Sequence, residues 1–264
     1  MVEISIVQAL LIGLWTAFCY MGNLWGIYTN RCIVLSFGVG VILGDIPTAL
    51  QCGAIGELAF MGFGVGAGGT VPPNPIGPGI IGTHMAITMS SVTPESALPI
   101  SIPFAVAIQF LQTAIYTVRA GAPESAAHAL EKQDFNKFRR SANMTVILFG
   151  VAGFALGFLG AFSMDTLSKL VEMIPQWLLD GLTVAGGMLP AIGFAMIMSV
   201  MLKKELIPFA LLGYICAAYF SLPIIGIALV GAVFAIKHYN EAGKTAVAAA
   251  SAAEAQEVEH DDWI

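Results

Sequence analysis

Residues 53–82 of the chain read GAIGELAFMGFGVGAGGTVPPNPIGPGIIG, a single carboxylate followed by a dense run of glycine and proline. After Glu57 no Lys, Arg, Asp or Glu occurs until Glu95. A bare charge at bilayer depth is costly unless it faces protein or a wet cavity, so it indicates function. Helix-breaking residues at that depth are tolerated only where the freed backbone groups line a cavity or are buried in protein. The stretch therefore predicts a binding site inside a membrane protein.

The composition favours a membrane protein over a soluble one. Of 264 residues, 57% are hydrophobic and 11% are charged, whereas a soluble domain carries roughly 25% charged residues. Charged positions bound six long blocks, each longer than the roughly 20 residues that a spanning helix needs. These blocks are 4–30, 57–95, 96–118, 141–164, 181–202 and 206–236. The predicted fold class is an all-α integral membrane protein. The first block lacks the basic lead-in of a cleavable signal peptide.

The C-terminal tail carries most of the net charge. Six acids and one lysine follow Tyr239, which accounts for −5 of the chain's −6. Residues 240–264 are alanine-rich and acidic, so they predict a flexible tail after a membrane-embedded domain at 1–239. The tail is predicted to lie in the cytoplasm or the periplasm, and docking of a partner is the alternative role. The four cysteines lack CxxC spacing and indicate small buried hydrophobic residues, not a disulfide framework or a zinc site.

The N-terminal half combines spanning helices with a broken element. The second span is interrupted at 44–47, because proline removes a hydrogen-bond donor and clashes with the preceding turn. Residues 51–91 are too interrupted for one smooth helix and predict a re-entrant hairpin. The predicted elements are spans at 8–28, 32–50 and 99–118 and half-helices at 53–63 and 76–89.

The second half begins with a basic connection at 119–140. It holds five of the eleven Lys and Arg residues, so the positive-inside rule places it in the cytoplasm. Pro123 and Glu124 resemble a helix start. The elements predicted beyond it are a span at 143–162, an amphipathic interfacial helix at 163–174, a glycine-interrupted segment at 181–201 and two helices within 206–236 joined near 221–223.

Each half of the chain thus contains one apolar segment interrupted by glycine or proline. Such pairs are typical of inverted-repeat transporters whose binding site lies at the bilayer midplane. Direct sequence similarity between the two halves is not visible, so the inverted repeat is a hypothesis.

Glu57 is the leading candidate for substrate binding. A carboxylate accepts several hydrogen bonds, which suits the hydroxyl groups of a sugar. Gly53 and Gly64 lie at i−4 and i+7 from Glu57 on the same helical face, where they would let a ligand or a backbone approach closely. The alternative is a structural carboxylate that caps the N-terminus of a half-helix.

Three further residues are weaker candidates for substrate binding. Asn74 lies in VPPNP and can donate and accept at once, although Asn is common in turns for backbone reasons. Asp45 either contacts ligand, marks a helix end or pairs with Arg31. His84 lies in an otherwise apolar span, where a satisfied buried polar residue is the commoner role. The same holds for Gln51, Thr83 and Gln109.

Motifs for catalysis and metal binding are missing from the sequence. It has no Walker-type phosphate loop, no H-E-x-x-H and no paired-cysteine metal site. His128, His238 and His260 lie in connecting or tail segments without an evident activating partner. The chain therefore predicts a substrate pathway with no cofactor and no metal, and it is not an enzyme on its own.

Several short stretches of the sequence, Glu57 among them, also carry a family resemblance. The chain, from about residue 4 to 239, resembles the membrane-embedded enzyme IIC subunit of the mannose–fructose–sorbose branch of the bacterial phosphoenolpyruvate-dependent sugar phosphotransferase system. The stretches that carry it are Asn30-Arg31, Leu43-Gly44-Asp45, Gly56-Glu57-Leu58, Ile174-Pro175, Asp180-Gly181-Leu182, Gly186-Gly187-Met188 and the run from Pro208 to Tyr214. Within the branch, residues 66–79 look like the N-acetylgalactosamine or galactosamine type, because mannose-type members have fewer prolines there.

The resemblance implies an assembly in the bacterial inner membrane. It implies a IID membrane subunit as partner, a higher oligomer, and soluble IIB and IIA subunits that carry the phosphoryl group. Sugar would be bound between the membrane subunits and moved by an elevator-like displacement, with Glu57 at the sugar site and Asn74 carried over less securely. Nucleic acid has no part in this scheme.

The leading hypothesis is import of an amino sugar with concomitant phosphorylation by the partner subunits. Sorbose or mannose as the substrate is an alternative. Two rivals from other classes are an ion-coupled secondary sugar transporter and a scaffold subunit whose site lies wholly in its partner.

Overall fold

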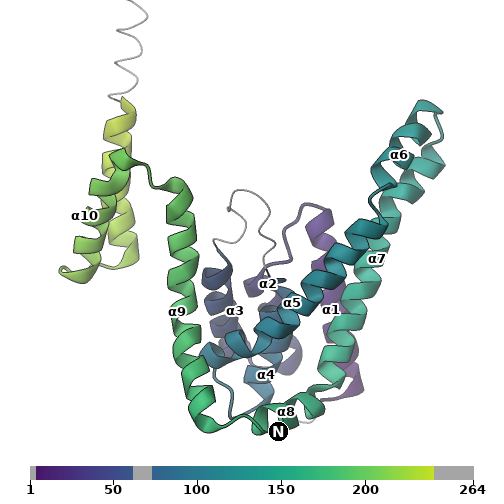
Figure 1. Ribbon diagram of the computed structural model, residues 1–264, viewed down its shortest axis with the longest axis horizontal. Helices are drawn as coiled ribbons and strands as arrows, with labels where there is room; N and C mark the ends of the chain where they lie inside the picture. The colour runs from purple at the N-terminus through teal and green to yellow at the C-terminus, as the bar shows by residue number, and fades with distance from the viewer. Residues whose placement is uncertain (1–3, 62–72, 241–264) are drawn as a thin grey trace, which may run out of the picture. The chain divides into compact units, whose positions relative to one another are not determined.

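The computed structural model describes residues 4–61 and 73–240, and within these ranges all regular structure is helical (Figure 1). The prediction of an all-α protein is confirmed. The elements are α1 (Ile6–Leu24), α2 (Cys32–Leu43), α3 (Ile46–Phe60), the π-helix η1 (Gly77–Gly82), α4 (Thr83–Thr88), α5 (Pro94–Val118), α6 (Ala122–Glu131), α7 (Phe135–Phe162), α8 (Met164–Glu172), α9 (Gln176–Met201), the 3-10 helix η2 (Lys204–Leu206), α10 (Ile207–Ala218) and a last helix, Ile224–Asn240.

Four of the described helices are long and apolar enough to cross a membrane. They are α1 (Ile6–Leu24), the stretch Pro94–Glu131 that contains α5 and α6, α7 (Phe135–Phe162) and α9 (Gln176–Met201). Large apolar side chains on them face outward, including Phe110, Val151 and Trp177, which are exposed. Contiguous apolar surface of this extent would drive aggregation in water, so it is the lipid-facing surface of a membrane protein.

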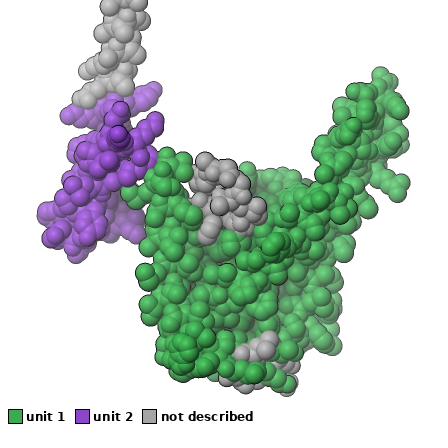
Figure 2. All heavy atoms as spheres, viewed as in Figure 1, with its two compact units in different colours: residues 1–200 green, residues 201–264 purple. Residues whose placement is uncertain are grey.

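The chain forms two compact units, residues 1–200 and 201–264 (Figure 2). In the first unit, α1 packs along α7, with Tyr20 against Phe149 at a ring-centroid distance of 4.7 Å. Gly157 lies directly on Thr16, and a methyl group there would overlap the threonine side chain. Small residues let membrane helices approach closely. The van der Waals contacts that result stabilise the pair, because the hydrophobic effect does not drive helices together within lipid.

Helices α2 and α3 form a hairpin of short helices. Their 12 and 15 residues span about 18 and 22 Å, less than the roughly 30 Å of a bilayer core. Gly44 ends α2 in the left-handed region (φ 84°), and the Asp45 side chain accepts a hydrogen bond from the Thr48 N–H at 3.1 Å to begin α3.

This hairpin corrects part of the predicted layout. The break in the second span is confirmed at Gly44, but α3 then runs unbroken from Ile46 to Phe60. The prediction of a half-helix beginning at Gly53 is therefore wrong. The predicted half-helix at 76–89 is confirmed as η1 followed by α4. Residues 62–72, with Gly64, lie outside the described part. The re-entrant hairpin predicted at 51–91, which would enter and leave the membrane on one side, stays a prediction.

The basic connection folds as part of a helical projection (Figure 1). The predicted helix start is confirmed by α6, with Pro123 in its first turn. The Arg119 guanidinium donates to the Ser141 carbonyl at 2.8 Å and to the Thr145 hydroxyl at 3.2 Å, which ties the end of α5 to α7. Helix α7 begins earlier than predicted because Asp134 caps it through the Lys137 N–H.

Downstream, α8 confirms the amphipathic helix, with Leu167 and Val171 buried and Lys169 exposed. The interruption predicted at 181–201 is wrong, because α9 is one continuous helix through Pro190. Neighbouring groups can re-satisfy a backbone carbonyl that such a proline frees. The inverted repeat loses this support and stays a prediction.

The second unit contains η2, α10 and the helix Ile224–Asn240. Two helices joined by a tight turn were predicted here, and the turn is confirmed at Ser221, which has a φ of 48°. Phe209 and Phe234 join the two helices, with ring centroids 5.7 Å apart. The tail at 241–264 lies outside the described residues.

Candidate functional site

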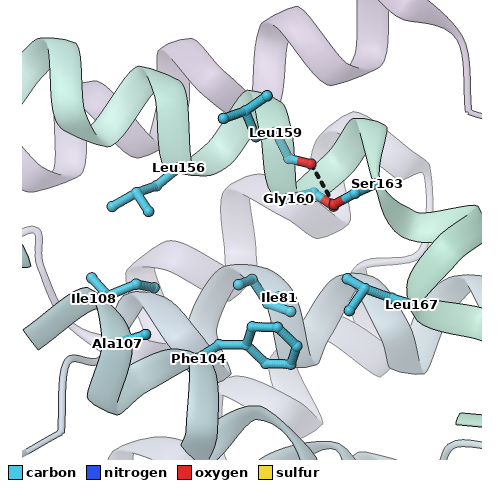
Figure 3. A pocket seen from close by; sticks show the side chains of 9 residues that line it. All are labelled: Ile81, Phe104, Ala107, Ile108, Leu156, Leu159, Gly160, Ser163 and Leu167. Carbon is cyan, nitrogen blue, oxygen red and sulfur yellow. Dashed lines mark hydrogen bonds between the residues drawn. The ribbon is translucent and has the colours of Figure 1, made fainter. Parts of the chain in front are cut away.

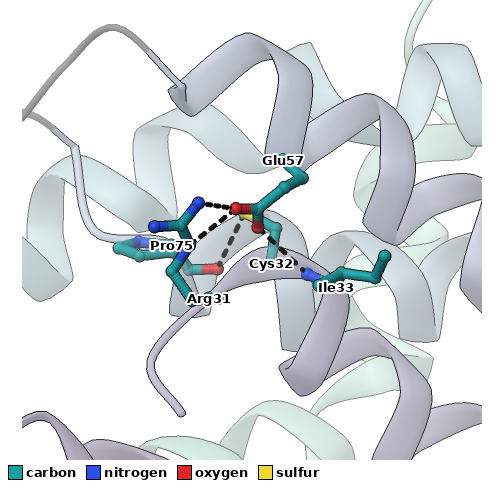
Figure 4. Close-up of polar contacts among 5 residues, drawn as sticks. All are labelled: Arg31, Cys32, Ile33, Glu57 and Pro75. Carbon is teal, nitrogen blue, oxygen red and sulfur yellow. Dashed lines mark hydrogen bonds and ion pairs between the residues drawn. The ribbon is translucent and has the colours of Figure 1, made fainter. Parts of the chain in front are cut away.

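Glu57 lies in the last turn of α3, where it faces the start of α2 (Figure 4). Arg31 stands immediately before α2, as its N-cap residue. The Arg31 Nε donates to Glu57 Oε1 at 2.6 Å, and Nη2 donates to the same oxygen. The antiparallel α2–α3 hairpin thus brings together two charges that lie 26 residues apart in sequence.

The second carboxylate oxygen points at the backbone of α2. Glu57 Oε2 lies 3.5 Å from the Ile33 nitrogen, whose N–H has no partner within the helix. The first N–H groups of a helix carry a partial positive charge and favour a carboxylate. This contact matches the structural alternative for Glu57, a helix cap. Sugar binding by Glu57 stays a prediction.

The ion pair is open to its surroundings. The Glu57 side chain is 19% exposed and that of Arg31 is 53% exposed. The hydrogen bond to the carboxylate raises the pKa of the Arg31 guanidinium above its ordinary value. A guanidinium has five N–H donors, and two groups of Arg31 reach Glu57. The remaining donors and the second carboxylate oxygen can bind hydroxyl groups.

Close packing holds the two helices of this site together. An ideal Cβ at Gly53 would stand 2.9 Å from the Ile33 Cα, and one at Gly56 would stand 3.0 Å from the Cys32 Cβ. The Cys32 thiol in turn lies 3.8 Å from the Pro75 carbonyl oxygen, which links α2 to the segment before η1 (Figure 4). The space that Gly53 leaves is filled by α2, which matches the predicted close approach of a backbone. Approach of a ligand to Gly53 stays a prediction.

Asn74 is almost fully buried and held by the fold. Its backbone N–H donates to the Ala105 carbonyl at 3.0 Å, and its Oδ1 accepts from the Ile76 N–H at 3.0 Å. Its Nδ2 donates to Gln112 Oε1 at 2.5 Å, an oxygen that also accepts from the Tyr20 hydroxyl at 3.2 Å. This network joins α1, α5 and the segment before η1. Contact of Asn74 with sugar stays a prediction.

The two other candidates lie apart from the ion pair. Asp45 caps α3 at the opposite end of that helix, and Arg31 pairs with Glu57, so the alternative of an Asp45–Arg31 pair is wrong. His84 is fully buried on α4, and neither ring nitrogen has a hydrogen-bond partner. Burial of His84 is confirmed, but the expectation that it is satisfied is not met by the described residues.

Sequence reasoning missed the role of Arg31. The available signal was its place between two apolar blocks, directly before a helix start. It also missed Tyr20 and Gln112 as partners of Asn74, since no local pattern joins residues so far apart. Asn30 adds a buried side-chain oxygen without a partner beside Arg31.

Two cavities lie elsewhere in the first unit. One of about 280 Å³ is apolar and lies between α5 and α7, with Ile81 and Leu167 in its lining (Figure 3). The other, of about 260 Å³, lies on α5 beside Pro73 and is lined by Gln109 and Thr113 together with apolar groups. The first has too few polar groups to bind a sugar, whose hydroxyls need hydrogen-bond partners when buried.

The fold and its charged site define a multi-pass membrane protein with a polar site between short helices. Residues 6–237 match the family described as the sorbose-specific IIC component of the phosphotransferase system (PTS). The chain belongs to this family of membrane-embedded PTS permease components, and it is an integral protein of the bacterial inner membrane.

Curated relatives carry several sugar names. The N-acetylgalactosamine permease IIC component 1 of Escherichia coli (strain K12) is 33% identical over 178 residues, which cover 67% of this chain and 66% of the relative, just under two thirds. A putative N-acetylgalactosamine permease IIC component 2 of the same organism is 38% identical over 120 residues, 45% of this chain and 89% of the relative. The sorbose-specific EIIC component of Klebsiella pneumoniae is 27% identical and covers 75% of each chain.

Solved structures share the fold. One, described as a membrane protein, superposes with a TM-score of 0.81 at 24% identity and covers 90% of this chain and 97% of the other. A cryo-EM structure of the mannose transporter ManYZ with microcin E492 has a TM-score of 0.56 at 24% identity, with coverage of 90% and 96%.

Proposed function

We propose that the chain is the sugar-conducting subunit of a phosphotransferase system that imports an amino sugar of the N-acetylgalactosamine type. The observation that supports this most strongly is the Arg31–Glu57 pair, which offers hydrogen-bond donors and acceptors side by side and is partly exposed. The sugar class is supported by the 33% and 38% identical relatives named for N-acetylgalactosamine.

In this proposal the subunit binds and moves the sugar, and phosphoryl transfer takes place elsewhere. A IID membrane subunit completes the transport unit in a higher oligomer, and soluble IIB and IIA subunits deliver phosphate. Glu57 accepts hydrogen bonds from sugar hydroxyls, and an elevator-like displacement carries the site across the membrane. Trapping the product as a phosphate ester on the inner side supplies the driving force.

The test is phosphoenolpyruvate-driven uptake of hexoses and amino sugars in cells that co-express the partner subunits. Glu57→Gln removes a charged acceptor, and a hydrogen bond to a charged group contributes about 1.5–3 kcal/mol. Uptake should fall by roughly tenfold to a hundredfold while membrane insertion is retained. Glu124→Gln, at an exposed acid on α6, is the matched control. Unchanged uptake in Glu57→Gln would remove Glu57 from the site.

Energised vesicles without phosphoenolpyruvate and soluble subunits separate this function from ion-coupled transport. Accumulation of unmodified sugar in such vesicles would establish the rival.

A scaffold role is favoured by one specific observation, the contact of Glu57 Oε2 with the Ile33 N–H. In a pure scaffold, added sugar would leave Arg31 equally reactive toward phenylglyoxal. In a binding subunit, sugar should slow that reaction, which peptide mass spectrometry measures at Arg31 directly. Absence of protection at saturating sugar would favour the scaffold.

A further inference from the structure

We infer that Arg31 sets the charge of the sugar that the site accepts, so that neutral sugars bind in preference to sugars with a free ammonium group. The inference rests on the proposed function, because it places the sugar at Glu57. It assigns a specificity role to a residue that the resemblance and the sequence left without one.

The geometry makes the site electrically neutral. Nε and Nη2 of Arg31 both donate to Oε1 of Glu57, with an Nε–Oε1 distance of 2.6 Å. A carboxylate alone would attract the ammonium group of a hexosamine. With a guanidinium bound to the same carboxylate, the two contributions largely cancel for a ligand that approaches from outside.

Because the Arg31 side chain is more exposed than that of Glu57, the electrostatic potential at the entrance of the site is more positive than negative. The Arg31 side chain is 53% exposed and the Glu57 side chain 19% exposed. An incoming ligand therefore meets the cation more readily than the anion. Like charges repel, so an ammonium group is disfavoured at this entrance while a hydroxyl or an acetamido group is not.

Hydrogen-bond chemistry leads to the same preference. The N–H groups of Arg31 that do not reach Glu57 can only donate. Hydroxyl and amide carbonyl oxygens accept such bonds, whereas an ammonium group has no lone pair to offer. An acetamido or hydroxyl substituent can therefore bind both halves of the pair, whereas the ammonium substituent of a hexosamine can bind only the carboxylate.

Asp45 does not restore a negative site. Asp45 is the N-cap residue of α3; it lies twelve residues before Glu57, about 18 Å along the helix axis, and its side chain caps the helix. Among the described residues, Glu57 is the carboxylate that forms an ion pair with Arg31.

The experiment compares uptake of galactose, galactosamine and N-acetylgalactosamine in cells with the complete system, at a pH where the amine is protonated. Galactose and galactosamine differ at one substituent, so their uptake ratio isolates charge from acetyl contacts. Arg31→Gln should raise the ratio of galactosamine to galactose about tenfold, which is about 1.4 kcal/mol. Arg31→Lys should leave the ratio near the wild-type value.

Glu57→Gln should lower the ratio of galactosamine to galactose below the wild-type value. The double variant Arg31→Gln with Glu57→Gln should return the ratio toward wild type. Arg140→Gln removes the same charge from an exposed position at the start of α7 and should change nothing. If Arg31→Gln fails to insert, the ratio in Glu57→Gln still decides, because a ratio that stays at the wild-type value there contradicts the charge preference.

The results separate this inference from the proposed function. A ratio that stays unchanged in Arg31→Gln and in Glu57→Gln, while total uptake falls in Glu57→Gln, overturns the charge preference alone. Wild-type uptake of all three sugars in both single variants overturns the placement of sugar at this pair, and with it the proposed function.

Discussion

Gly53→Ala is expected to loosen the α2–α3 hairpin that carries the ion pair. An ideal Cβ at this position stands 2.9 Å from the Ile33 Cα and 3.1 Å from the Ser36 Cβ. The nearest atom belongs to backbone and cannot rotate away, so α2 must shift. Glu57 lies one turn further along α3, and the same shift would lengthen its contact with Arg31. Transport should therefore fall together with stability.

The change in the free energy of unfolding caused by Gly53→Ala is the sum of two opposed contributions. Overpacking of a close contact costs typically about 1–3 kcal/mol, and replacing glycine by alanine inside a helix recovers up to about 1 kcal/mol. Gly187→Ala on α9 is the matched control, since nothing lies within 4 Å of its Cβ position. The difference between the two variants cancels the helix term. It should be about 1–3 kcal/mol, or roughly 2–4 °C in Tm per kcal/mol.

Buried thiols provide the assay. Cys19, Cys32 and Cys52 are buried in the first unit, and Cys216 is less so. In a Cys216→Ser background, a thiol-reactive dye reports thermal unfolding of the first unit in detergent. Gly53→Ala should label at a lower temperature than Gly187→Ala. Equal melting temperatures, with sugar uptake also equal, would refute the tight α2–α3 contact and its coupling to the site.

Two further variants probe the packing around the site. Gly157→Val should prevent the close approach of α1 and α7, because its side chain would overlap Thr16; the expected result is loss of folded protein in size-exclusion chromatography, and a monodisperse, active variant would contradict the packing. Tyr20→Phe removes one hydrogen bond to Gln112, which should cost about 1 kcal/mol in the thiol assay with little change in the sugar ratio; a large change in that ratio would instead place this network at the substrate.

Much of the layout could be predicted from local pattern. Long uncharged blocks mark membrane helices because a charge in lipid is expensive. Gly44 and Asp45 mark the turn between α2 and α3 because a left-handed residue and a side-chain cap suit that turn. The same reasoning failed for α9, since it treated residues 181–201, with their glycines and Pro190, as an interrupted segment. Neighbouring groups can tolerate a proline in a membrane helix, and sequence does not reveal them.

The candidate site shows the same division. Glu57 stands out in sequence because it is one charge in a long apolar stretch. Its partner does not, because Arg31 is 26 residues away and reaches Glu57 only through the hairpin. Asn74 likewise stands out as a polar residue among prolines, but its contact with Gln112 depends on α5.

The amino-acid order alone settled that this chain lies in a membrane, that a turn at Gly44 and Asp45 separates α2 from α3, and which carboxylate is unusual. These properties follow from transfer free energies and from backbone chemistry, which act within a few residues. Folding in three dimensions settled which charge neutralises Glu57 and that Asn74 is locked in a network. Such pairings depend on how the helices pack, and a pattern of a few neighbouring residues does not indicate that packing.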